Sequence, residues 1–384
     1  MNKDLFGARA TGTLQRIVTN WGPDHAFIPA QLPPDWELPS DSWPLLMEAT
    51  NQLQLLEGIG RTLPNPAVIL RLLKDREAIR SSEIEGTYAT PQELLLYELS
   101  PRESKSESDP VNQHLEVLNY KRALEHGASS DLPICLRLIR ELHGILMSGV
   151  RGKDKTPGEF RKVPVAIGST HRFIPPPHES LLEHLGPLEE YAQLQHSQHH
   201  PLVDCFLIHY QFETIHPFQD GNGRVGRLLI GIMIQRAMGL TKPWLHMSEY
   251  FENHRDEYFG GLFNISSTGN WTTWIDYCLQ GVAEQAKATI CRCERLLEIR
   301  KEFSERIAKV GGHVRLNLII DAIFDSPFVR VVDLQRQLGI SYPTAAKDVE
   351  RLVQAEILSE LETIYPKTFY SKEVFRVAYE SLSG

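Results

Sequence analysis

Residues 216–227 read His-Pro-Phe-Gln-Asp-Gly-Asn-Gly-Arg-Val-Gly-Arg, a stretch that combines a base, a carboxylate, two glycines around an asparagine and two arginines. Apolar runs at helical spacing flank it at 202–215 and 228–238. The stretch is therefore predicted to connect two helices. Gly221 and Gly223 would let the backbone turn tightly and approach a ligand, so that amide hydrogens at the start of the second helix converge on phosphate oxygens.

The side chains of this stretch suit a polyphosphate. His216, neutral near pH 7, can take a proton from an attacking hydroxyl, and Asp220 supplies the hard oxygen that Mg²⁺ prefers. Asn222 can hydrogen-bond phosphate oxygens. Arg224 and Arg227, one helical turn apart, lie on the same face and can neutralise the outer phosphates. The stretch holds no covalent nucleophile, so it indicates transfer of a phosphorus-centred group to an external hydroxyl by positioning and charge stabilisation.

The stretch resembles the active-site signature of the Fic family, H-x-F-x-[DE]-G-N-G-R-x-x-R, and matches it at every specified position. The resemblance implies a mainly α fold that binds ATP and Mg²⁺ and transfers AMP to a Ser, Thr or Tyr hydroxyl of a target protein, releasing pyrophosphate. It implies His216 as the general base and Asp220 as the metal ligand. It also implies a phosphate-binding set: Gly221, Asn222, Gly223, Arg224 and Arg227. A related branch that phosphorylates usually carries lysine at the position of Gly223, so the glycine favours AMP transfer.

Residues 158–177 resemble a second part of the family. Gly158-Glu159-Phe160-Arg161 precedes alternating apolar residues at 163–167, and the segment ends in a run of three prolines. We expect a β-hairpin that ends in a stiff proline segment. The resemblance implies the Fic flap, which binds an extended stretch of the target protein by strand addition. An ordinary surface hairpin is the alternative.

Aromatic residues after the active-site helix match the positions at which family members close an adenine pocket. These positions are Tyr258, Phe259 and Leu262. Their flat faces suit a purine, but an aromatic stripe at helical spacing is also typical of an ordinary protein core.

Residues 81–86, Ser-Ser-Glu-Ile-Glu-Gly, resemble the inhibitory motif of the family, [ST]-x-x-x-E-[GN], through Ser81, Glu85 and Gly86. A carboxylate inserted at the phosphate site would pair with Arg227 and repel the nucleotide. The resemblance therefore implies autoinhibition by the N-terminal part of the chain. The alternative is that Glu85 is a solvated residue at a helix end.

Composition limits the class of protein. The 384 residues exceed the usual size of one core, so two or three domains are expected. The five cysteines show no disulfide framework and no paired zinc spacing. With no leader at the start and no apolar run near the roughly 20 residues needed to span a bilayer, we expect a cytoplasmic protein without a membrane segment. The net charge of −9 argues against nucleic acid as the main partner.

The pattern predicts four parts along the chain. They are an N-terminal helical module at 1–110 that begins as an extended arm over 1–45, a catalytic core at 111–285, a connector helix at 286–313 and a small α+β winged-helix domain at 314–384. In the last part the pattern predicts helices at 316–324, 332–338 and 342–355, followed by a hairpin at 357–370.

The winged-helix domain could bind DNA through one helix face, formed by Ser341, Tyr342, Thr344, Lys347 and Arg351. However, residues 314–384 hold eight basic and ten acidic residues, a poor footprint for duplex binding. A packing or dimerisation module is the alternative, and a homodimer is left open.

The sequence thus predicts an autoinhibited protein adenylyltransferase whose partners are ATP and a target protein. Two alternatives remain: a de-AMPylating hydrolase that uses the same site, and a winged-helix transcription regulator that senses nucleotide. The regulator is the weaker reading, because a sensor would not need His216.

Overall fold

The structure is a computed structural model, and it describes residues 1–63, 65–106, 108–149, 155–168, 173–194, 197–311, 314–362 and 364–380, without the side chain of Val68. The chain divides into two compact units. The first comprises 1–57, 77–89 and 103–286, and the second comprises 58–76, 90–102 and 287–384. In the part of the chain that the structure describes, no helix is both long enough and apolar enough to cross a membrane.

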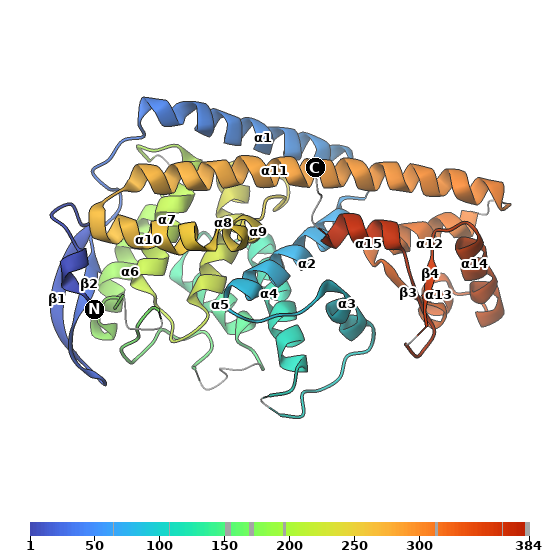
Figure 1. The fold of residues 1–384 in the computed structure, drawn as a ribbon, viewed down its shortest axis with the longest axis horizontal. Helices are drawn as coiled ribbons and strands as arrows, with labels where there is room; N and C mark the ends of the chain where they lie inside the picture. The colour runs from blue at the N-terminus through green and yellow to red at the C-terminus, as the bar shows by residue number, and fades with distance from the viewer. Residues whose placement is uncertain are drawn as a thin grey trace. The chain divides into compact units, whose positions relative to one another are not determined.

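Helices dominate both units (Figure 1). Those of the first unit alone are α4 (Val111–Ser129), α5 (Leu136–Leu146), α6 (Leu181–Ala192), α7 (Pro201–Ile215), α8 (Asn222–Ala237), α9 (Ser248–Asn253) and α10 (Arg255–Thr268), with short 3-10 turns at Lys3–Leu5, Ser40–Ser42 and His178–Ser180. Three long helices contribute residues to both units: α1 (Trp43–Thr62), α2 (Pro66–Ile84) and α11 (Trp271–Lys309). The predicted mainly α fold class is confirmed.

Two buried helices form the centre of the first unit. α7 and α8 pack against each other, and α6 and α10 pack on α7 while α4 and α5 pack on α8. Both central helices are apolar around most of their circumference, and Phe206 and Ile230 are fully buried. Since both helices are fixed along their length, the loop between them at 216–221 is held at both ends.

The N-terminal arm is more regular than the sequence indicates. β1 (Gly12–Thr19) and β2 (Gly22–Pro29) form an antiparallel hairpin, blue in Figure 1. The expected arm without periodicity is therefore wrong over these residues. Burial does not alternate along these strands: the neighbours Ala26 and Phe27 of β2 are both fully buried, whereas Val18 of β1 is 83% exposed. The ring of Phe27 lies 5.5 Å from that of Phe173. Tertiary burial of β2 thus stabilises strands that the local pattern does not specify.

The predicted hairpin at 158–177 is reduced to one antiparallel bridge among its described residues. Ile167 and Phe173 exchange main-chain hydrogen bonds of 2.8 and 3.2 Å. Residues 169–172, the predicted hairpin tip, lie outside the described residues. The bridge brings Phe173 and the proline run back beside the start of the segment.

The second unit combines short helices with a small sheet. Its own elements are α3 (Pro91–Leu99), α12 (Val314–Asp325), α13 (Val331–Leu338), α14 (Tyr342–Gln354), α15 (Lys372–Tyr379), β3 (Phe328–Arg330), β4 (Ser359–Leu361) and β5 (Thr368–Tyr370). The strands are antiparallel in the order β3-β5-β4. The three helices and the hairpin predicted after residue 314 are confirmed, whereas β3 and α15 were not predicted. The three residues of β3 are too few to show a period, but α15 is as long as α13 and was missed.

Candidate active site

His216 follows the last turn of α7 in a left-handed backbone conformation, with φ of 51°. Its Nδ1 lies 3.2 Å from the carbonyl oxygen of Glu213. A carbonyl can only accept, so Nδ1 carries the proton and Nε2 is left with a free lone pair. Burial lowers the pKa of His216 to about 4, so the imidazole is neutral near pH 7. The side chain is therefore in the form that a general base requires.

The loop after His216 is closed by the side chain of Asn222. Its Oδ1 accepts from the main-chain N–H of Phe218 at 2.8 Å, and its Nδ2 donates to the Phe218 carbonyl at 2.9 Å. The amide predicted to bind phosphate is thus engaged within the loop, and Asn222 offers an anion its main-chain N–H. Gly221 has φ of 80°, and a Cβ there would lie 3.0 Å from Met147 Sδ. Both observations favour glycine at this turn.

Arg227 points from α8 towards the end of α2 rather than into open solvent. Its Nη2 donates to Glu85 Oε1 at 2.8 Å, and its Nε donates to Ser81 Oγ at 3.0 Å. Arg227 is 2% exposed and Ser81 is fully buried. Burial would raise the pKa of Glu85, but the charge of Arg227 outweighs it and holds that pKa below its ordinary value. Glu85 is therefore an ionised partner of Arg227.

The carboxylate of Glu85 also lies directly above the start of α8. A Cβ on Gly223 would lie 2.3 Å from Glu85 Oε1, so a side chain there would displace the carboxylate from this position. Gly86 follows with φ of 81°, the left-handed conformation that ends the turn. The three motif residues of segment 81–86 are thus brought to the amide-rich end of the helix.

Arg224 faces a different carboxylate. Its Nη1 donates to Glu116 Oε2 at 3.2 Å, and both side chains are about 95% buried, with exposures of 6% and 5%. Thr87 donates to the same oxygen at 2.8 Å. The two arginines that the sequence places on one helix face therefore have different surroundings. Arg227 lines a cavity, whereas Arg224 is paired with Glu116 and does not line it. The sequence did not indicate Glu116 as part of the site.

Asp220 is the one predicted metal ligand. Its side chain is 50% exposed, and Oδ1 accepts from the Gly221 N–H at 2.6 Å. Within the described ranges no group of three or more His, Cys, Asp or Glu side chains could hold a metal ion. A single hard carboxylate beside an anion site fits Mg²⁺, which usually takes one or two carboxylates and completes its shell with phosphate oxygens and water.

Some of these residues line a cavity of about 520 Å³ in the first unit, namely His216, Gly223, Arg227, Glu85 and Gly86. The predicted residues Asp220, Gly221, Asn222 and Arg224 are not part of its lining. The predicted adenine residues line it too, but differently: Tyr258 is 1% exposed and its hydroxyl lies 3.0 Å from His209 Nε2, whereas Phe259 is 42% exposed. The remaining predicted residue, Leu262, is also part of the lining.

Glu213 lines the same cavity and was not predicted. Its Oε1 is buried and has no hydrogen-bond partner among the described residues. Burial raises the pKa of Glu213 to about 8; Arg227 lowers it and Glu85 raises it further. Near pH 7 the cavity therefore holds the ionised carboxylate of Glu85 and the protonated carboxyl of Glu213, both close enough to Arg227 to interact with its charge. In the sequence, the position of Glu213 one helical turn before His216 could have indicated that it lies near the site.

Arg161 also belongs to the site, although the sequence indicated it only as part of the segment at 158–177. It is 3% exposed, and it donates to the carbonyls of His216 at 2.9 Å and Pro176 at 2.5 Å. Burial lowers its pKa to about 10. Since carbonyls are its partners on both sides, Arg161 joins the base of segment 158–177 to the loop that carries His216.

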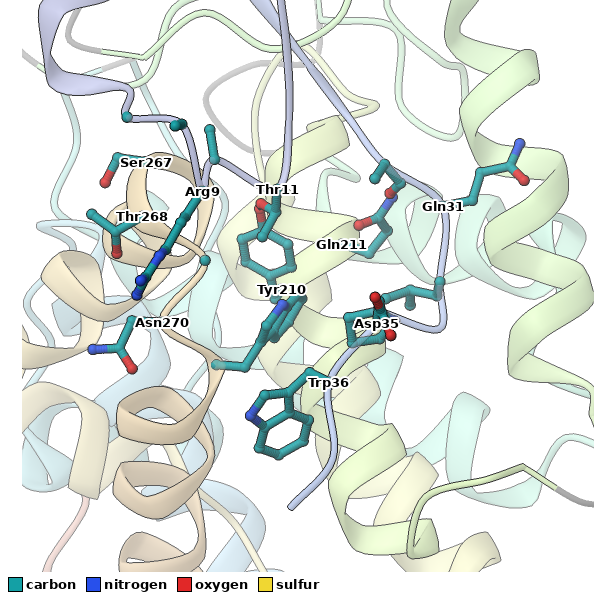
Figure 2. A pocket seen from close by; sticks show the side chains of 18 residues that line it. Arg9, Thr11, Gln31, Asp35, Trp36, Tyr210, Gln211, Ser267, Thr268 and Asn270 are labelled. Carbon is teal, nitrogen blue, oxygen red and sulfur yellow. The ribbon is translucent and has the colours of Figure 1, made fainter. Parts of the chain in front are cut away.

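A larger cavity, of about 860 Å³, lies elsewhere in the first unit. Figure 2 shows Arg9 extending past Thr268 towards Asn270, and the ring of Tyr210 next to Thr11, whose Oγ1 lies 2.8 Å from the Tyr210 hydroxyl. Among the residues described, none with a predicted role lines this cavity. The smaller cavity is therefore the candidate active site.

Comparisons with known proteins give two family matches along the chain. Residues 43–129 match the family described as Fic/DOC family N-terminal, and residues 133–234 match the Fic/DOC family. Over 131 residues, 33% of this chain, the sequence is 34% identical to a protein named Protein adenylyltransferase Fic from Drosophila virilis and 33% identical to one of that name from Drosophila melanogaster. The matched region spans 26% of the length of each relative, so the chain covers about a quarter of them.

Solved structures show a similar fold. A Fic family protein from Desulfovibrio desulfuricans G20 superposes with a TM-score of 0.57 and 19% identity, covering 89% of this chain and 98% of that one. Fic-1 from C. elegans superposes with a TM-score of 0.53 and 18% identity, covering 66% of this chain and 74% of the other. At these identities the likeness establishes the fold alone.

Proposed function

Because the chain belongs to the Fic/DOC family, we propose that it is an autoinhibited protein adenylyltransferase, which moves AMP from ATP to a Ser, Thr or Tyr hydroxyl of a target protein. One observation carries the proposal: a neutral His216 with its Nε2 free lies on the same cavity as Arg227 and the Glu85 carboxylate. Relatives named Protein adenylyltransferase Fic support the reaction class.

In this proposal ATP is oriented because the apolar and aromatic residues of the cavity bind its base and the charged residues bind its phosphates. The adenine ring lies against Phe259 and Leu262, with Tyr258 as the buried wall. The triphosphate runs towards Gly223 and Arg227, where the first amide hydrogens of α8 and one guanidinium bind phosphate oxygens. The stacking end supplies affinity for the base and the charged end sets the position of the α-phosphorus.

His216 then acts as the general base. Its Nε2 takes the proton of the target hydroxyl, the hydroxyl oxygen bonds to the α-phosphorus, and the bond to pyrophosphate breaks. The hydrogen bond from Nδ1 to the Glu213 carbonyl holds the ring while it becomes cationic. Asp220 would hold Mg²⁺ together with phosphate oxygens, and the ion would supply charge neutralisation for the leaving pyrophosphate.

Autoinhibition rests on the ion pair between Glu85 and Arg227. In this position the carboxylate occupies the space above Gly223 and takes the Nη2 donor that a terminal phosphate would need. Its negative charge also repels the phosphates. ATP could bind in a reactive pose only after the turn at 81–86 moves away.

A target protein would dock on the segment at 158–177. Ile167, Gly168 and Phe173 line the cavity, and Ile167 pairs with Phe173 across the single bridge. An extended target segment that adds alongside 163–167 would bring its hydroxyl towards His216. The side chains of a candidate target would then determine whether it binds to this segment.

For residues 314–384 we propose a winged-helix domain, supported by the element order helix, strand, helix, helix and two strands. Ser341 caps α14, and Tyr342 is 46% exposed. This domain could bind DNA through this face, or it could serve in packing or dimerisation. The excess of acidic residues in 314–384 favours packing or dimerisation.

The reaction is tested by incubating the full chain and its Glu85→Gly variant with Mg²⁺, a cell lysate and ATP labelled at either the α or the γ phosphate. We expect α label, and not γ label, on protein. Gamma label would mean phosphorylation and would overturn the proposal. A third arm, with protein already carrying labelled AMP, tests the hydrolase alternative: release of that label without pyrophosphate would favour it.

A further inference from the structure

His143 is a fully buried polar side chain of α5 that the proposed reaction does not use directly. Its Nε2 lies 3.0 Å from the carbonyl oxygen of Asp220, and its Nδ1 lies 2.8 Å from the main-chain nitrogen of Gly158. The ring stacks on Phe218, with centroids 3.7 Å apart and planes 4° from parallel. One imidazole of α5 thus contacts Gly158 and two residues of the loop after His216, Phe218 and Asp220.

The roles of its two nitrogens follow from their partners. The Asp220 carbonyl can only accept, so Nε2 carries the hydrogen and donates it. The Gly158 N–H can only donate, so Nδ1 accepts. Both ends of the ring are satisfied in one tautomer, and the stack on Phe218 fixes its plane. The ring is therefore a rigid link with one defined donor and one defined acceptor.

The donor end acts on the peptide between Asp220 and Gly221. The carbonyl of this peptide is held by His143, and its N–H, on Gly221, binds Asp220 Oδ1 at 2.6 Å. The orientation of the peptide plane therefore sets where the carboxylate of Asp220 points. Gly221 lies close to the same ring, since a Cβ there would be 3.5 Å from His143 Cδ2.

We propose that His143 is a positioning residue, which fixes the Asp220–Gly221 peptide and thereby aims the Asp220 carboxylate at the metal ion that ATP brings. This rests on the proposed function, in which Asp220 is the Mg²⁺ ligand. The acceptor end ties the same ring to Gly158, whose own carbonyl accepts from Arg140 Nε at 2.7 Å. The base of segment 158–177 thus anchors the ring that holds the metal-binding loop.

Three substitutions separate the two ends of the ring. His143→Gln can place an amide N–H near the position of Nε2 and keep the bond to Asp220. His143→Asn can place a carbonyl oxygen near the position of Nδ1 and keep the bond to Gly158, but it is too short to reach Asp220. His143→Phe keeps the stack on Phe218 and loses both bonds. A merely structural role would depend on the stack and on packing, not on which bond remains.

The test measures Mn²⁺, as a stand-in for Mg²⁺, by electron paramagnetic resonance on the full chain with Glu85→Gly and α,β-methylene ATP, which cannot transfer AMP. We expect His143→Phe and His143→Asn to weaken Mn²⁺ binding by about 10- to 100-fold, the usual effect of losing a partner that orients a metal ligand. His143→Gln should retain most of the affinity of the parent. The melting temperature of each variant checks that it folds.

The outcomes separate the inference from the function on which it rests. If Asp220→Ala weakens Mn²⁺ binding but His143→Phe and His143→Asn do not, the positioning role is overturned and the metal assignment stands. If His143→Gln loses as much affinity as His143→Asn, the bond to Asp220 is not the cause and the inference is again overturned. If Asp220→Ala itself has no effect, the metal assignment fails and the inference falls with it. Should His143→Phe fail to fold, the order of the Gln and Asn variants decides.

Discussion

At the scale of single residues, the site is governed by which polar atoms already have partners. The Nδ1 of His216 donates to a carbonyl, and its Nε2 keeps a lone pair. The Asn222 side chain instead forms hydrogen bonds within the loop, and that of Arg224 pairs with Glu116. Of these three motif side chains, His216 therefore lines the cavity, whereas Asn222 and Arg224 form hydrogen bonds outside its lining.

We expect His216→Ala to bind ATP as the parent does while AMP transfer falls by about 10²- to 10⁴-fold, the usual loss on removing a general base. Transfer of α label measures turnover, and calorimetry measures nucleotide binding. The matched control is His126→Ala, because His126 pairs with Glu141 and does not line the cavity. Transfer at the parental rate by the His216 variant would remove this side chain from the mechanism.

Glu213 gives a prediction about pH. Its folded-state pKa of about 8 lies above the ordinary value of 4.5, so the folded protein retains a proton that the unfolded chain releases between these values. The stabilisation is complete below pH 4.5 and is lost as pH rises towards 8. Glu213→Gln, which stays neutral, should change the melting temperature least at pH 5 and should raise it at pH 8, by about 2–4 °C for each kcal/mol of stabilisation that the ionised carboxylate removes from a unit of this size.

The matched control for that experiment is Glu257→Gln, since Glu257 is exposed. Its effect on the melting temperature should be the same at both pH values. An equal effect of Glu213→Gln at pH 5 and pH 8 would mean that this carboxyl titrates normally.

At the scale of elements, the end of α2 is the part that decides whether the site can work. The helix ends at Ile84, and the turn after it carries Glu85 to Arg227. We expect Glu85→Gly to raise AMP transfer, including self-modification, at least about tenfold, which corresponds to ~1.4 kcal/mol of barrier. Adding Arg227→Ala should abolish the gain, because the phosphate then loses its guanidinium.

Glu83→Gly is the control for a loosened helix end. Glu83 pairs with Arg80 at 2.7 Å and not with Arg227, so its loss should leave AMP transfer near the parental rate. If both glycine variants activate equally, the turn is acting through flexibility and not through the carboxylate of Glu85.

At the scale of the whole molecule, the second unit is assembled from three distant stretches of chain. Tyr379, near the end of α15, donates to Asp75 Oδ2 at 2.9 Å, and both side chains are buried, at 6% and 1% exposure. Arg76 donates to the carbonyl of Tyr379 at 2.9 Å. The first half of α2 is thus part of the same core as the C-terminal helix.

Tyr379→Phe should therefore destabilise the second unit by about 1.5–3 kcal/mol, the usual contribution of a hydrogen bond to a charged group. Scanning calorimetry should show the loss in one melting transition while the other stays in place. Tyr365→Phe is the control, because Tyr365 is 95% exposed. A Tyr379 variant as stable as the Tyr365 variant would show that the buried hydroxyl contributes nothing.

The sequence by itself determined the features that depend on neighbours in the chain. The apolar periods on both sides of 216–227 specify two helices and the loop between them, and Gly221 stands where the left-handed backbone conformation favours glycine. The period of residues 316–355 likewise specified α12, α13 and α14. Local sterics and periodicity suffice for such features because every group that decides them lies within a few residues.

Only the tertiary structure decided which of the motif side chains face the nucleotide. Glu116 from α4 pairs with Arg224, His143 from α5 binds the Asp220 carbonyl, and Oε1 of Glu213 has no hydrogen-bond partner in the described part of the chain. The strands β1 and β2 likewise form because Phe27 finds a buried site. These outcomes depend on hydrogen bonds and burial between elements that are far apart in sequence, and no periodic pattern records which distant group will satisfy a buried polar atom.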